Sequence, residues 1–153
     1  MSKGIAARSL LAGLLVALAA CDSRPLPAHW SLTRDGVSLR DADAQRRITI
    51  PLPEWQWLEP PFGSPPVLAL GPKGEAVVTS NVVPTLWRVD PQTRAVSVHP
   101  LALDADTDRD VGFSSLAYSA KHGAFFAVSE PDGSVWRIDP SLTRAQKIAP
   151  GSK

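Results

Sequence analysis

A pattern of 49 residues that occurs twice constrains the fold of this chain most strongly. The stretch 65–101 contains LWRVDP and aligns with the stretch 113–150, which contains VWRIDP, so that Trp87 lies 49 residues before Trp136. A fainter copy lies upstream at 36–52. Self-similarity at a period of about 20–50 residues is typical of supersecondary units that stack on one another. The sequence therefore predicts a repeat architecture in which the two tryptophans pack at equivalent positions.

Each repeat unit has the pattern of four short strands. In the unit 65–101, turn signals at Pro72-Lys73-Gly74 and Asp90-Pro91-Gln92-Thr93 separate apolar or alternating runs, as expected for strands joined by tight turns. In the unit 113–150, Pro131-Asp132-Gly133 is a hairpin signal. The expected strands of the unit 65–101 cover 67–70, 76–79, 86–90 and 95–99. The fold class is therefore predicted to be all-β, with sheets covered on both faces.

The segments LALGPKGEAVVTSN, LWRVDP and LAYSAKHGAFFAVSE resemble blade repeats of β-propeller proteins of the NHL, YVTN and SMP-30-like groups. The resemblance covers most of residues 28–150 and implies about two and a half four-stranded antiparallel blades. A propeller needs at least four blades. The missing blades leave three alternatives: a ring completed by other chains, an open or partial propeller, or a truncated remnant. We favour the open or partial propeller.

The first twenty residues have the three parts of a secretory signal. Lys3 and Arg8 lie in a region without acidic residues, residues 10–17 form an apolar run, and small residues lead to Cys21. The run is shorter than the ~20 apolar residues that cross a membrane. Residues 1–20 are therefore predicted to be a signal peptide.

The sequence Leu18-Ala19-Ala20-Cys21 resembles the lipobox of bacterial lipoproteins. The resemblance implies cleavage before Cys21, a diacylglycerol on its sulfur, and a fatty acyl chain such as palmitate on its nitrogen. An ordinary signal peptide that is cut nearby is the alternative. Lipidation predicts a membrane anchor on the periplasmic side, with residues 21–29 as a tether and 30–150 as the β-repeat domain. Asp22 resembles the inner-membrane retention signal of enteric lipoproteins, which favours the inner membrane.

Charge and cysteine content limit the possible functions. Removal of residues 1–20 takes away Lys3 and Arg8 and changes the formal net charge from +1 to −1. Such a chain lacks the basic surface of a nucleic-acid-binding protein, so no nucleic-acid partner is expected. Cys21 is the only cysteine, so an intramolecular disulfide is impossible even in an oxidising compartment.

One stretch has an acidic pattern that is compatible with a metal ion. Four aspartates alternate there: Asp104, Asp106, Asp108 and Asp110. Oxygen ligands at alternate positions suit Ca²⁺, but EF-hand loops also need glycine at the sixth position and glutamate at the twelfth. Arg109 and Ser115 occupy these two positions. The four aspartates therefore either bind Ca²⁺ or form a solvated loop between blades.

Trp55 and Trp57 lie in the proline-flanked stretch PLPEWQWLEPPFGSPP. At a spacing of two, both side chains share one face of an extended segment. Such a pair can stack on sugar rings or anchor a protein partner. The alternative is that the two indoles cover a sheet edge.

We predict that the protein is not an enzyme, and we assign no catalytic residues. The three histidines are scattered at positions 29, 99 and 122, and the sequence has neither an HExxH nor a GxSxG motif. The predicted function is a membrane-anchored periplasmic lipoprotein whose β-domain serves protein–protein interaction or scaffolding in the cell envelope. The alternatives are a glycan- or calcium-binding module and, by resemblance to enzymatic propellers, a hydrolase or lactonase fragment that is active only as an oligomer. No cofactor is expected, apart from the alternative of Ca²⁺ at the four aspartates.

Overall fold

The computed structural model describes residues 29–40, 46–105 and 111–149. Cys21, Asp106, Asp108 and Asp110 lie outside the described residues. Within the described ranges the chain forms strands, turns and bends but no helix, and thus none that is long and apolar enough to cross a membrane. The prediction of an all-β fold is confirmed.

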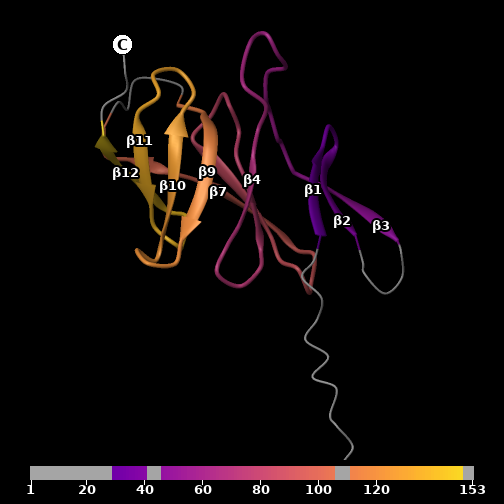
Figure 1. Ribbon diagram of the computed structural model, residues 1–153. Helices are drawn as coiled ribbons and strands as arrows, with labels where there is room; N and C mark the ends of the chain where they lie inside the picture. The colour runs from indigo at the N-terminus through magenta and orange to yellow at the C-terminus, as the bar shows by residue number, and fades with distance from the viewer. Residues whose placement is uncertain (1–28, 41–45, 106–110, 150–153) are drawn as a thin grey trace, which may run out of the picture.

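The strands form three sheets, which we call the first, the middle and the last sheet (Figure 1). The first sheet contains β1 (His29–Thr33), β2 (Gly36–Arg40) and β3 (Arg47–Pro51) in the order β1-β2-β3. The middle sheet contains β4 (Leu68–Leu70), β5 (Ala76–Val78), β6 (Thr85–Val89) and β7 (Val96–Pro100) in chain order. The last sheet has the order β8-β12-β11-β10-β9, with β8 (Ala102–Leu103), β9 (Phe113–Ser119), β10 (Ala124–Ser129), β11 (Val135–Ile138) and β12 (Arg144–Ala149).

The sequence repeat is reproduced in the positions of the strands. β2 and β3 begin and end 49 residues before β6 and β7. The sequence-predicted strands of the unit 65–101 match β4 to β7 to within one residue at each end. All neighbouring strands of the first and middle sheets pair antiparallel. The expected four-strand unit is therefore confirmed in the middle sheet.

The last sheet differs from the prediction because it contains a fifth strand. β8 pairs with β12 in parallel, and the amide of Ala102 donates to the carbonyl of Thr143 at 2.9 Å. The amide of Asp104 donates to the carbonyl of Ala145 at 3.1 Å. Four antiparallel strands are thus the wrong description of this sheet. The chain stays extended after β7 and satisfies backbone groups at the edge of β12 that water would otherwise solvate.

The middle sheet is covered on both faces. Because neighbouring residues of a strand point to opposite faces, Val77 packs toward the last sheet and Val78 toward the first, and both are fully buried. Trp87 lies in the core between the first and middle sheets, and Trp136 in the core between the middle and last sheets. Their predicted packing role is confirmed, since they are 2% and 0% exposed.

The turns after β6 and β11 each contain an aspartate that precedes a proline and accepts hydrogen bonds from backbone amides further along the turn. The Asp90 carboxylate accepts hydrogen bonds from the amides of Gln92 and Thr93, both at 2.8 Å. The equivalent Asp139 accepts one from the amide of Thr143 at 2.9 Å. Short polar side chains that bond to the following backbone stabilise such turns. The turn predicted at 90–93 is confirmed.

Candidate functional site

The β3–β4 loop, residues 52–67, is the longest connection within the described residues and projects beyond the ends of the sheets (Figure 1). Loops of this length without secondary structure are uncommon in compact domains, and the ordered ones are usually functional. The loop contains both tryptophans that the sequence indicated as a binding pair. We therefore take it as the candidate site.

Two buried or half-buried indoles fix the start of the loop. The Nε1 of Trp87 donates to the carbonyl of Pro53 at 2.7 Å, from within the core below. The Nε1 of Trp55 donates to the carbonyl of Thr79 at 2.9 Å, and its ring packs against the core between the first and middle sheets. Both bonds join the loop to residues of the middle sheet or just beyond it. The base of the loop is consequently held to the sheet by side chains that also pack in the core.

The centre of the loop is held by a polar segment that follows β5. The hydroxyl of Ser80 donates to the carbonyl of Gln56 at 2.6 Å. Asn81 accepts from the amide of Leu58 at 2.8 Å and donates to the carbonyls of Leu58 (2.7 Å) and Ser64 (2.8 Å). Ser80 is fully buried and Asn81 is 6% exposed. Because these bonds lie away from water, they hold both limbs of the loop at a defined distance from each other.

The apex of the loop presents large apolar side chains to solvent. Phe62 is 80% exposed and Leu58 is 48% exposed. The amide of Phe62 donates to the carbonyl of Glu59 at 2.9 Å, which closes a turn at the apex. A hollow of about 380 Å³ beside the apex is lined by Phe62, Asn81, Val82, Glu130 and Pro131. The apex thus offers an exposed aromatic ring on a hydrogen-bonded backbone next to a hollow, and aromatic side chains are frequent anchors in interfaces.

Trp55 and Trp57 are brought together, with ring centroids 5.8 Å apart and an interplanar angle of 37°. They do not form an equal, exposed pair. Trp55 is bound to the middle sheet and packs against the core, whereas Trp57 contacts the ring of Trp55; both residues are partly buried. Binding by this pair stays a prediction, in which Trp57 is the ring that does not pack in the core.

Of the four aspartates proposed for Ca²⁺, the structure describes Asp104. Its carboxylate accepts from the amide of Lys147 at 2.9 Å and so helps to hold β8 against β12. Within the described ranges, no three His, Cys, Asp or Glu side chains gather closely enough to hold a metal ion. The calcium site stays a prediction, because its other three ligands lie outside those ranges.

Two of the histidines contact a serine on the same hairpin or strand. The Nε2 of His99 lies 2.7 Å from the hydroxyl of Ser97, and the Nδ1 of His122 lies 2.9 Å from that of Ser119. Partial burial lowers the pKa of His99, because it disfavours the imidazolium form. Each pair joins neighbouring positions of one sheet, and we assign no chemical step to either.

Sequence reasoning missed Leu58, Phe62 and Asn81. The first two lie in the same proline-flanked stretch as the tryptophans, and apolar residues between prolines in a polar segment were an available signal. Asn81 follows Ser80 directly after a strand, where a short polar side chain often bonds to loop backbone. Its partners lie 17 and 23 residues away, so pattern reading did not indicate them.

Comparison with known proteins supports the fold. No protein-family model and no curated protein sequence matches the chain. Two solved structures of an extracellular domain from one B. thetaiotaomicron protein are similar to it, one described as part of a hybrid two-component system and the other as part of a one-component system. The TM-scores are 0.57 and 0.54 at 11% and 12% identity, over 82% of this chain. The chain spans 16% of the length of those domains. The chain is therefore an all-β protein whose fold is shared with part of a larger extracellular domain.

Proposed function

We propose that this chain is a lipid-anchored, non-catalytic β-domain of the bacterial cell envelope that binds a protein partner through its β3–β4 loop. The observation that supports this most directly is the 80% exposure of Phe62 at the apex of a loop whose backbone is bonded to the buried side chain of Asn81. Leu58, which is bonded to the same asparagine, adds a second exposed apolar side chain.

An exposed phenylalanine on a fixed loop favours binding for an energetic reason. Phe62 exposes apolar surface to water, and its transfer into a partner pocket is worth about 25 cal/mol per Å² buried. A loop that is already ordered loses little conformational entropy on binding, so more of that free energy appears as affinity. Aromatic residues that fill a partner pocket are typical hot spots of protein interfaces.

The location follows from the lipobox and agrees with the structural comparison. Cleavage before Cys21 would leave two or more acyl chains on that residue, which anchor a protein stably. The similar structures belong to an extracellular domain, in keeping with a position outside the cytoplasm. We interpret the three stacked sheets as blades of an open, partial propeller. Asp22 still favours the inner membrane.

A substitution tests the lipid anchor. Cys21→Ser should abolish palmitate labelling and release the chain from membranes.

The experiment that tests partner binding is photo-crosslinking in the native membrane. A benzophenone amino acid replaces Phe62 in one variant and Leu70, which is 49% exposed on the middle sheet, in a control variant. We expect a discrete adduct with one other envelope protein from position 62 and none from position 70. The same adducts from both positions, or none from position 62, would contradict the proposal.

A further inference from the structure

The outward face of the last sheet resembles a face that is buried elsewhere in the same molecule. In the middle sheet, Val77 and Leu86 point toward the last sheet and both are fully buried. Their repeat equivalents, 49 residues later, are Phe126 and Val135. These two side chains point away from the core and are only partly buried. Two apolar positions that are buried between the middle and last sheets are therefore apolar again on the outward face of the last sheet, where the structure shows them only partly buried.

Further apolar residues extend this outward face. Phe126 pairs across strands with Ala117, and Val128 pairs with Val135, so all four side chains share the face. Ile148, which lies at a bulge in the neighbouring strand β12, is 49% exposed. These apolar side chains lie among exposed polar ones, because Arg137 pairs with Phe126 and Ser115 pairs with Val128. A mixed face of this kind is typical of weak, non-obligate interfaces.

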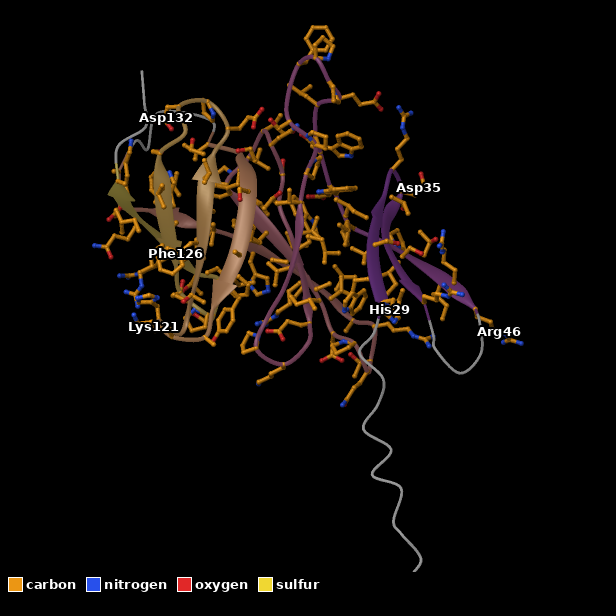
Figure 2. All side chains as sticks on the ribbon, viewed as in Figure 1. His29, Asp35, Arg46, Lys121, Phe126 and Asp132 are labelled. Carbon is orange, nitrogen blue, oxygen red and sulfur yellow. The ribbon has the colours of Figure 1, made fainter. Side chains whose placement is uncertain are left out.

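The opposite end of the stack is polar at the corresponding positions. Arg40 of the first sheet lies 49 residues before Val89, which is buried against the first sheet, and Arg40, its cross-strand partner Arg47 and nearby Thr49 are all exposed. An arginine thus stands on the outward face of the first sheet where the middle sheet has a buried valine. Figure 2 shows Arg46 at this end of the molecule and Phe126 at the other. Polar outer faces are the mark of a terminal unit in stacked repeats.

We infer that the outward face of the last sheet is an interface for a second copy of this chain, which binds through the same face. The polar end formed by exposed Arg40, Arg47 and Thr49 does not offer an apolar surface, so head-to-tail stacking is disfavoured. Face-to-face pairing of two identical apolar faces forms a closed two-fold dimer, the commonest form of assembly. This interface continues the sheet-on-sheet packing that already joins the middle and last sheets.

Charge and area are both compatible with a weak dimer. At one end of the face, a groove of about 420 Å³ is lined by side chains of both signs, including Arg137, Arg144, Asp104 and Asp139. A two-fold copy can therefore place carboxylates against guanidinium groups. Four strands about 4.8 Å apart, each of about six residues, give a face of about 19 by 20 Å. The buried area, on the order of 800 Å² over two copies, lies below that of most stable interfaces, so the dimer is concentration-dependent.

Sedimentation equilibrium of the full chain in density-matched detergent tests this inference. We expect the apparent mass to rise from monomer toward dimer between about 10 and about 500 µM, and Phe126→Asp to weaken dimerisation at least tenfold. Leu70→Asp, at an apolar residue of similar or greater exposure on the middle sheet, should leave the equilibrium unchanged. Circular dichroism and the thermal midpoint establish whether each variant is folded.

A second measurement avoids any disruptive substitution. A benzophenone amino acid at position 126 keeps an aromatic side chain there, and we expect it to crosslink to a peptide from β9–β12 of another copy. A monomer at every concentration, or adducts from position 126 with a different protein, would overturn the inference. The result is independent of crosslinking from position 62, because the loop lies on another surface.

Discussion

Asn81 and Leu58 are joined by two hydrogen bonds although 23 residues separate them. The amide of Leu58 donates to Oδ1 of Asn81 at 2.8 Å, and Nδ2 of Asn81 donates to the carbonyl of Leu58 at 2.7 Å. The asparagine side chain thus pairs with loop backbone as a neighbouring strand would. This pairing holds the loop in position without a regular strand on either side.

Removal of the Asn81 side chain should destabilise the protein and release the loop. In Asn81→Ala the amide and carbonyl of Leu58 lose their partner in a poorly hydrated place, which costs about 1–3 kcal/mol. Urea unfolding should show that loss in the free energy of unfolding. Gln92→Ala, at an exposed turn residue, should stay within about 0.5 kcal/mol of wild type. An equally small effect of Asn81→Ala would refute the anchoring role.

Gly112 supports the same anchor from the last sheet. A Cβ at this position would overlap the backbone of Asn81 and Val82, and backbone cannot yield as a flexible side chain does. Gly112→Ala should therefore cost about 1–3 kcal/mol and increase proteolysis of the loop. Gly123→Ala is the control: a Cβ there meets nothing within 4 Å, so only backbone strain of about 1 kcal/mol is expected. Unchanged loop proteolysis in Gly112→Ala would contradict the link.

Substitutions of the two loop tryptophans should have different effects, Trp55→Ala mainly on stability and Trp57→Ala mainly on any glycan binding. Trp55→Ala removes a ring that packs against the core and a 2.9 Å hydrogen bond, and should cost about 3 kcal/mol or slightly more. Trp57→Ala should cost less than Trp55→Ala, because the Trp57 ring is partly buried against Trp55 but does not pack in the core between the first and middle sheets. A glycan-binding role predicts that Trp57→Ala abolishes retention on peptidoglycan while the fold survives. Retention equal to wild type would remove that alternative.

Asp139 should make stability depend on pH in the acidic range. Its partial burial alone would raise the pKa, but hydrogen bonds from Ser141, Arg144 and Thr143 outweigh burial and lower the pKa from 3.8 to about 2. The lowered pKa stabilises the fold above the unfolded value of 3.8, and this contribution is lost as pH falls toward about 2.

The corresponding measurement compares wild type with Asp139→Asn in urea titrations from about pH 7 to about pH 2. Wild type should be more stable at neutral pH, and the difference should shrink below about pH 4. A difference that is constant over the whole range would show that the charge of Asp139 contributes nothing.

Much of the fold was predictable because the repeat and the alternation of side chains are local signals. Trp87 and Trp136 indicated equivalent core positions, and the strands of the middle sheet matched to within one residue. The parallel strand β8 was not predictable in this way. Its two residues form a strand because they pair with the edge of β12, about 40 residues away in the sequence, and their own residue types do not indicate this.

The candidate site was predictable only in part. The sequence indicated the stretch containing Trp55 and Trp57, and binding by these two residues stays a prediction. The exposed side chains at the apex of the loop are Leu58 and Phe62. Which apolar residue of a loop faces water depends on the bonds that orient its backbone. Those bonds come from Asn81, on another part of the chain, and a sequence pattern does not encode their direction.

The most direct test of the proposed function is the affinity of the crosslinked partner for wild type and for Phe62→Ala, measured by isothermal titration calorimetry. Leu70→Ala is the control for loss of an exposed apolar side chain. We predict that Phe62→Ala weakens binding at least tenfold, about 1.4 kcal/mol, with an unchanged free energy of unfolding, and that Leu70→Ala binds as wild type does. Equal affinities for wild type and Phe62→Ala would contradict the proposal that the β3–β4 loop is the partner-binding site.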